Sequence, residues 1–221
     1  MKLIDISKNY GEKQALHGVD LELGDGEITA VLGESGAGKT TLLSVIAGLL
    51  PHEGKVEGAG RVSYLFQSPK LLPNLNLEDN LKFVLPKSEW EKIGETLAKV
   101  GLKGREKSRP AELSGGEKQR VAIARAFLYP HDTLLMDEPV ASLDLSVKKT
   151  LIELTLSLWK ERRETVVFVT HDVREAVLLA CRALVLKGGR IVGDVALSAP
   201  YPRDFFSAHA EERELIRLLM D

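Results

Sequence analysis

A glycine-rich segment, Gly33-Glu34-Ser35-Gly36-Ala37-Gly38-Lys39-Thr40, constrains this chain more than any other part of its sequence. It matches the pattern G-x-x-x-x-G-K-[ST] at every fixed position, and it follows an apolar run, 28–32, that is typical of a buried strand. Glycines at 33, 36 and 38 let successive backbone N–H groups turn inward toward a triphosphate, where side chains would obstruct them. The segment therefore predicts a strand, a phosphate-binding loop and a helix, in that order.

Several side chains of this segment are suited to hold a nucleotide and its metal ion. Lys39 can reach the β- and γ-phosphates, and the hydroxyl of Thr40 can ligate Mg²⁺. The helix that starts here directs the positive end of its dipole at the same anion. Ser35 and Thr41 complete the predicted phosphate contacts. An ordinary glycine-rich turn is the alternative, and the strand before and the helical pattern after the loop disfavour it.

A second segment, Leu113-Ser114-Gly115-Gly116-Glu117-Lys118-Gln119-Arg120, also predicts an anion contact. Ser114 and Glu117 form a capping box at the start of a helix, which explains these two residues but not the glycines. Each glycine costs about 1 kcal/mol relative to alanine in a helix. Bare amides at a helix N-terminus bind anions, so Ser114, Gly115 and Gly116 are interpreted as a second phosphate contact.

With both motifs in place, the chain resembles, over nearly its whole length, the nucleotide-binding subunit of an ATP-binding cassette (ABC) transporter. Residues 133–138 resemble the Walker B strand of this family. The resemblance implies that Asp137 holds Mg²⁺ and that Glu138 polarises the attacking water. It also implies that Gln67 senses the metal ion and the water, and that His171 contacts the γ-phosphate.

The resemblance assigns two further residues. Tyr10 matches the aromatic residue that stacks on adenine, and Ser142-Leu143-Asp144 is similar to the D-loop, so that Asp144 belongs to the nucleotide site. From sequence alone, a turn-flanking tyrosine is nearly as good an interpretation of Tyr10. The implied cofactors are ATP and Mg²⁺.

The implied fold class is α/β, with a P-loop NTPase core of ABC type, a small antiparallel β-subdomain and an inserted α-helical subdomain. We expect one ABC ATPase domain over 1–221, made of a nucleotide-binding core with the β-subdomain (1–67 and 131–198), a helical signature subdomain (68–130) and a C-terminal helical tail (199–221).

Local patterns add detail to this division. Residues 3–7 and 19–23 predict antiparallel strands, and Gly188-Gly189 predicts the turn of a hairpin. Ser88 and Glu91 have the spacing of a capping box, which predicts a helix that starts at Ser88. The tail predicts an amphipathic helix with four apolar residues on or near one face, Leu215, Ile216, Leu218 and Leu219.

The resemblance also implies partners. Two copies would pack head to tail when ATP binds, each lending its signature residues Ser114, Gly115 and Gly116 to the ATP held by Lys39 of the other. Integral membrane permease subunits would dock near 68–77, with a solute-binding protein as a further partner. The stretch from Thr170 to Ala176, T-H-D-V-R-E-A, is similar to importers, and the brevity and charged tail of the chain are similar to the nitrate/sulfonate/taurine group.

Two alternatives stay open at this point. One is an ATPase of the lipoprotein-release, macrolide-export or cell-division kind, which acts on an envelope partner. The other is a soluble ABC ATPase of DNA repair or translation, but the chain shows neither their long insertions nor a second cassette.

Charge and composition limit the kinds of partner and the compartment that this chain can have. The net charge of −2 gives no basic field for nucleic acid, so no nucleic-acid partner is expected. Cys181 is the single cysteine, which suits a reducing compartment. No apolar run approaches the roughly 18–20 residues that span a bilayer. The predicted location is cytoplasmic, at the inner face of the cell membrane through the permease subunits.

Overall fold

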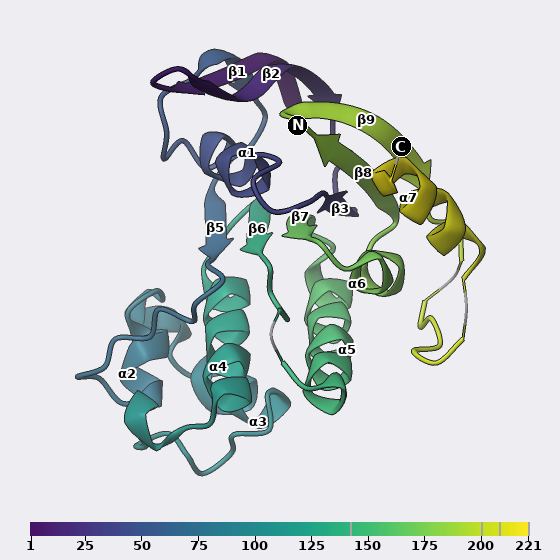
Figure 1. Ribbon diagram of the computed structural model, residues 1–221. Coiled ribbons are helices and arrows are strands. Elements are labelled where there is room, and N and C mark those ends of the chain that lie inside the picture. Colours follow the sequence, from purple (N-terminus) through teal and green to yellow (C-terminus); the bar gives the residue numbers. More distant parts are fainter. Residues whose placement is uncertain (142, 200, 208, 221) are drawn as a thin grey trace.

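A mixed six-stranded sheet forms the centre of the molecule in the computed structural model, which describes residues 1–141, 143–199, 201–207 and 209–220 (Figure 1). Its strands lie in the order β5-β6-β7-β3-β8-β9, and all neighbouring pairs are parallel except β8 with β9. Their bounds are β3 (Ile28–Leu32), β5 (Val62–Leu65), β6 (Thr133–Asp137), β7 (Thr165–Thr170), β8 (Arg182–Lys187) and β9 (Arg190–Ala196).

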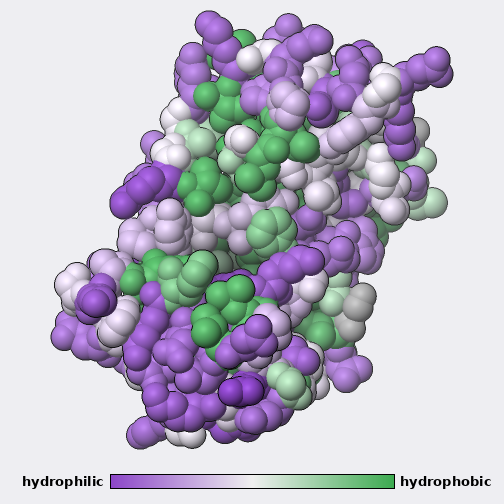
Figure 2. All heavy atoms as spheres, turned by 90° about the vertical axis from the view of Figure 1, so that its left-hand side faces the viewer, coloured by the Kyte–Doolittle hydropathy of each residue, from purple (hydrophilic) through white to green (hydrophobic). Residues whose placement is uncertain are grey.

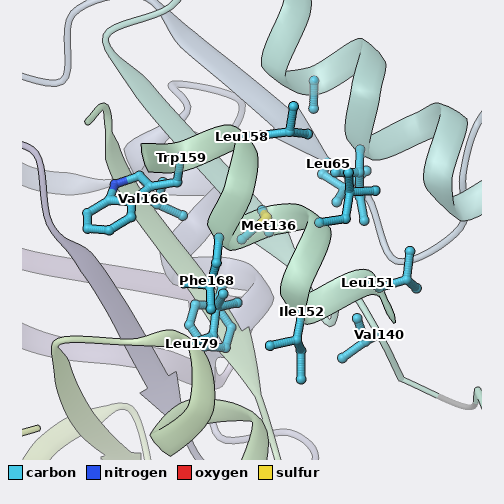
Figure 3. Packing of buried hydrophobic residues seen from close by; sticks show 14 of the residues in the cluster. Leu65, Met136, Val140, Leu151, Ile152, Leu158, Trp159, Val166, Phe168 and Leu179 are labelled. Carbon is cyan, nitrogen blue, oxygen red and sulfur yellow. The ribbon is translucent and has the colours of Figure 1, made fainter. Parts of the chain in front are cut away.

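The central strands are apolar along their whole length because both faces of the sheet are covered. In β7, Val166 and Phe168 belong to one core cluster, whereas Val167 and Val169 belong to the other. The first cluster includes Trp159 and is shown in Figure 3. Alternate side chains of the sheet therefore pack into two separate apolar layers. Polar side chains are accommodated at the ends of the strands.

A second, three-stranded antiparallel sheet covers one of these faces together with helix α1 (Lys39–Ile46) (Figure 1). Its order is β2-β1-β4, with β1 (Lys2–Tyr10), β2 (Lys13–Glu22) and β4 (Glu53–Glu57). The predicted pairing of 3–7 with 19–23 is confirmed, although both strands are longer. β4 was not predicted because it is mostly exposed and carries no alternating apolar pattern.

The segment between β5 and β6 is helical and lies beyond the carboxyl ends of these strands (Figure 1). It contains α2 (Leu77–Lys82), the short 3-10 helices η1 (Lys87–Glu89) and η2 (Pro110–Glu112), α3 (Lys92–Lys99) and α4 (Gly115–Leu128). The predicted helix start at Ser88 is wrong. Ser88 lies inside η1, and α3 begins at Lys92, where Ile93 and Leu97 become buried on one face.

The remaining helices are α5 (Leu145–Arg162), α6 (Val173–Leu179) and α7 (Ala210–Met220). In the predicted tail helix, Leu215 is fully buried and Leu218 and Leu219 pack against the core, but Ile216 is 46% exposed. The predicted amphipathic helix is thus present, and Ile216 lies beside its buried face and not within it. None of the helices in the described part of the chain is long and apolar enough to cross a membrane.

Candidate nucleotide site

A cleft of about 790 Å³ opens between the small sheet, the loop before α1 and the carboxyl ends of the central strands. Parallel strands that end at one edge of a sheet commonly bind ligands there. The lining residues are Tyr10, Lys13, Ala15, Glu34, Ser35, Gly36, Gly38, Lys39, Thr40, Thr41, Gln67, Glu138 and His171.

The glycines give the loop its path. Gly36 and Gly38 have φ of 82° and 105°, a conformation that L side chains rarely adopt. A Cβ at Gly38 would lie 2.5 Å from the carbonyl oxygen of Ala15 in β2. Gly38 therefore lets the loop pass close beneath the small sheet before α1 begins.

Lys39 is held under the loop that it follows. Its ammonium group donates to the carbonyl oxygens of Gly33 at 2.7 Å and Glu34 at 2.9 Å, and the residue is 7% exposed. Burial lowers the pKa of Lys39, while the nearby carboxylates of Glu138 and Asp137 act in the opposite direction. The charge is thus placed in advance for an anion in the cleft.

The buried carboxyl group of Asp137 lies at the end of β6, beside the start of α1. The hydroxyl of Thr40 donates to its Oδ1 at 3.2 Å. Burial raises the pKa of Asp137, and burial together with this carboxylate raises the pKa of Tyr64 to about 12. A hydroxyl and a carboxylate are the hard oxygen ligands that Mg²⁺ prefers, so Thr40 and Asp137 fit that ion.

Glu138 joins the ends of three neighbouring strands. Its Oε2 accepts from the side-chain amide of Gln67, beyond β5, at 3.2 Å, and its Oε1 lies 3.4 Å from Nδ1 of His171, beyond β7. Glu138 itself has φ of 46°, which is strained for a residue with a side chain. A carboxylate held between an amide and an imidazole can orient and deprotonate a water molecule.

The predicted residues divide into two groups in space. Tyr10, Ser35, Gly36, Gly38, Lys39, Thr40, Thr41, Gln67, Glu138 and His171 line the cleft, and Gly33 and Asp137 contact its lining. Among the described residues that line it, Ser114, Gly115, Gly116 and Asp144 do not occur. Ser142, predicted in the D-loop, lies outside the described residues.

Ser114 nevertheless has the predicted local structure. Its hydroxyl accepts from the backbone N–H of Glu117 at 3.3 Å, and Oε2 of Glu117 accepts from the N–H of Ser114 at 2.8 Å. The side chain of Gln119 donates to the carbonyl oxygen of Pro139 at 2.6 Å. This contact ties α4 to the segment that follows Glu138.

Sequence reasoning missed Lys13, Ala15 and Glu34 as lining residues. Lys13 and Ala15 belong to β2, and only the folding of the small sheet over the loop brings them to the cleft. The nearest signal was Tyr10, at the end of the adjacent strand β1.

Comparison with known proteins agrees with this geometry. Residues 16–141 match the family model described as ABC transporter. The chain belongs to this family. Members bind ATP and hydrolyse it to drive transport, so the chain is an ATP-hydrolysing transport subunit, and the predicted family and activity are confirmed.

Two curated relatives illustrate the likeness. The chain is 42% identical to the aliphatic sulfonates import ATP-binding protein SsuB 2 of Streptomyces avermitilis, over 93% of this chain and 84% of that protein. It is 41% identical to SsuB 1 of Paracoccus denitrificans, with the same descriptive name, over 97% of this chain and 90% of that protein. These relatives agree with the importer group and give the two alternatives no support.

Solved structures confirm the α/β fold of ABC type. The chain is 29% identical, with a TM-score of 0.77, to the ATP-binding cassette MJ0796 in a dimeric, post-hydrolysis state bound to ADP and Pi, over 90% of this chain and 99% of that one. It is 28% identical, with a TM-score of 0.78, to cbiO1 from Clostridium perfringens, part of the ABC transporter complex cbiONQ, over 89% and 88% of the two chains.

Proposed function

We propose that this chain is the ATPase subunit of an importer for aliphatic sulfonates or closely similar small anions. The observation that carries the solute class is the shared name of relatives that align over nearly the whole chain. The proposed machine comprises two copies of this chain, permease subunits in the membrane and a solute-binding protein. In this arrangement the chain lies at the cytoplasmic face of the membrane.

Within the cleft, the loop amides and Lys39 hold the phosphates, with Ser35 and Thr41 beside them, and the exposed ring of Tyr10 stacks on the adenine. Thr40 and Asp137, with Gln67 nearby, would hold Mg²⁺, and a metal ion bound there would screen the phosphate charge. The contacts of Lys39 and Thr40 support these assignments because they already direct both side chains toward one space.

Glu138 acts as the general base toward water, while Gln67 and His171 orient its carboxylate from either side. The support is the pair of contacts at 3.2 Å and 3.4 Å, which use both carboxylate oxygens. Hydrolysis removes the γ-phosphate contacts, and the site can then open.

The proposed ATP-bound form is a homodimer. Ser114, Gly115, Gly116 and Asp144 do not line the cleft of their own chain in the described structure, so each set is available to a second copy. Backbone amides at the start of α4 supply the anion contact. ATP would then be part of the interface.

The permease subunits are proposed to dock beside the edge strand β5. A groove of about 360 Å³ lies between β5, the segment after Gln67, the residues that directly follow α2, and α4, with Phe66, Leu72 and Phe83 among its lining. Phe83 is 71% exposed, and Figure 2 views this side of the molecule, where hydrophobic patches lie among hydrophilic side chains. Arg125, which also lines the groove, donates to the carbonyl oxygens of Pro69 and Lys70 and so fixes the segment after Gln67.

Glu138→Gln tests the hydrolysis step. The amide keeps the shape of the carboxylate but cannot accept the proton from water, so turnover should fall by about 10²- to 10⁴-fold. With Mg-ATP the variant should become a stable dimer in light scattering and co-purify with its permease. Glu153→Gln, an acid-to-amide change at an exposed position of α5 outside the cleft, is the matched control and should keep wild-type turnover. Wild-type turnover by Glu138→Gln would refute the proposed base.

Growth on different sulfur sources tests the solute class. Deletion of the gene should abolish growth on an alkanesulfonate as sole sulfur source and leave growth on sulfate unchanged. Unchanged growth on alkanesulfonates, with envelope proteins and no permease captured by Glu138→Gln, would favour the envelope alternative.

A further inference from the structure

The position of His171 depends on the backbone that carries it. Its side chain is 60% exposed, and its contact with Glu138 at 3.4 Å is longer than a strong hydrogen bond. An exposed imidazole can sample several rotamers. What holds the loop between β7 and α6 therefore decides whether this imidazole meets Glu138.

Side chains on both sides of His171 fix this loop. Oγ1 of Thr170 donates to Oε2 of Glu175 at 2.5 Å and accepts from the backbone N–H of Asp172 at 3.0 Å. Oδ1 of Asp172 accepts from the N–H groups of Arg174 at 2.9 Å and Glu175 at 3.4 Å, and so caps α6. The loop is thus built on two carboxylates, of which Glu175 is only 4% exposed.

One cation from another element joins both carboxylates. Nζ of Lys148, in the first turns of α5, lies 2.7 Å from Oε1 of Glu175 and 3.3 Å from Oδ2 of Asp172. A buried carboxylate without a cation is costly, so Glu175 holds Lys148 strongly. The ammonium group therefore joins α5, which begins directly after Asp144, to the loop that carries His171.

We propose that Lys148 is a positioning residue that holds His171 against Glu138 by bracing its loop on α5. This inference rests on the proposed role of His171 in hydrolysis. Asp144 and His171 belong to the two groups of site residues that lie apart in one chain. Through Lys148, the helix that begins after Asp144 contacts the loop that carries His171. A displacement of α5 at a dimer interface would thus move the imidazole.

Lys148→Met tests the link in the assembled transporter. Misplacement of a catalytic group by about 1 Å can cost 10²-fold, so kcat should fall by about 10- to 100-fold. The KM for ATP should change less than about twofold, because the contacts of Lys39 are untouched. Lys148→Arg keeps the charge and should restore most of the rate. Lys149→Met, which removes a neighbouring charge paired with exposed Glu153 at 3.9 Å, is the matched control and should keep wild-type turnover.

A double-mutant cycle with His171→Ala separates positioning from general damage. If Lys148 acts through His171, Lys148→Met should lower the single-turnover rate of the wild type but not that of His171→Ala. Equal losses in both backgrounds would overturn the proposal. A wild-type rate for His171→Ala alone would overturn the role of His171 itself, and that failure is visible in the single variant.

Folding is controlled with Lys148→Met/Glu175→Gln. This double variant removes the cation together with the buried charge, and the glutamine oxygen can still accept from Thr170. We expect a thermal unfolding midpoint near that of Glu175→Gln but a kcat about tenfold or more below it. Equal kcat in these two folded proteins would show that Lys148 serves only to neutralise Glu175, which refutes the positioning role.

Discussion

Gly38→Ala should damage the phosphate loop far more than Gly36→Ala, although both glycines have positive φ. A side chain in this conformation costs about 1–3 kcal/mol, and that cost applies at both positions, with φ of 105° and 82°. At Gly38 the new Cβ would also lie 2.5 Å from the carbonyl oxygen of Ala15 and 3.2 Å from Cδ2 of Leu16. Gly36 has no atom within 4 Å of such a Cβ in the described structure.

Relief of the contact at Gly38 requires a backbone shift, because a carbonyl oxygen cannot rotate away. Overpacking of this kind costs about 1–3 kcal/mol more, which is the expected difference in unfolding free energy between the two variants. For a domain of this size, each kcal/mol lowers the thermal midpoint by about 2–4 °C.

Thermal unfolding of the two variants and the wild type, without nucleotide, measures this difference by circular dichroism. Equal midpoints for the two variants would refute the argument, since the close approach of the loop to β2 would then carry no energetic weight. ATP binding by Gly38→Ala should also weaken, because the shift would move the amides that are proposed to face the phosphates.

Two further predictions concern parts of the fold outside the loop. Leu215→Ala should lower the free energy of unfolding by about 2–5 kcal/mol, because it leaves a cavity under α7. Ile216→Ala, at a 46% exposed position, should change it by about 0.5 kcal/mol. Urea unfolding measures both, and equal losses would refute the packing of this helix. Asp194 accepts two hydrogen bonds from Arg182, at 2.8 Å and 2.6 Å, and these lower the pKa of its carboxyl group. The stabilisation is therefore present above the pKa of the unfolded chain, about 3.9, and is lost as the pH falls through the lower pKa of the folded protein. The pair is partly exposed, so the wild type should exceed Asp194→Asn by less than about 1 kcal/mol at pH 6 and lose that advantage progressively as the pH falls below the unfolded value. A constant difference would contradict the assignment.

The phosphate loop could be predicted from local sequence because its conformation depends on local chemistry. Glycines permit positive φ, and Lys39 and Thr40 sit at fixed offsets from them, so no distant contact is needed to recognise the motif. The same holds for the start of α4, where Ser114 and Glu117 cap each other.

The proximity of Gln67, Glu138 and His171 could not be predicted from local sequence. Each follows an apolar strand, but the sequence does not state that β5, β6 and β7 are neighbours in the sheet. Only the resemblance to ABC transporters implied that these three side chains share one site. Periodicity alone would have left three isolated polar residues.

The failures have local causes. β4 is polar and exposed, so its pairing with β1 gives no hydrophobic signal. The false start at Ser88 arose because a capping pattern outside a helix is indistinguishable from one inside it until burial is known. Lys13 and Ala15 were missed because only the arrangement of the small sheet above the loop brings them to the cleft.

The site concentrates features that are unfavourable to folding by themselves. Lys39 is buried with a lowered pKa, Asp137 is buried with a raised pKa, and Glu138 has positive φ. Such costs persist where function requires them. An anion beside Lys39 and a cation beside Asp137 would relieve the two burial costs at once, so a metal nucleotide is the ligand whose charges complement both. Because this relief is available only to the folded chain, Mg-ATP should stabilise the fold as it binds. Hydrolysis followed by phosphate release should remove part of this stabilisation from the loops that carry Glu138 and His171. The residues that are proposed to recognise the nucleotide would thereby make the position of these loops depend on it.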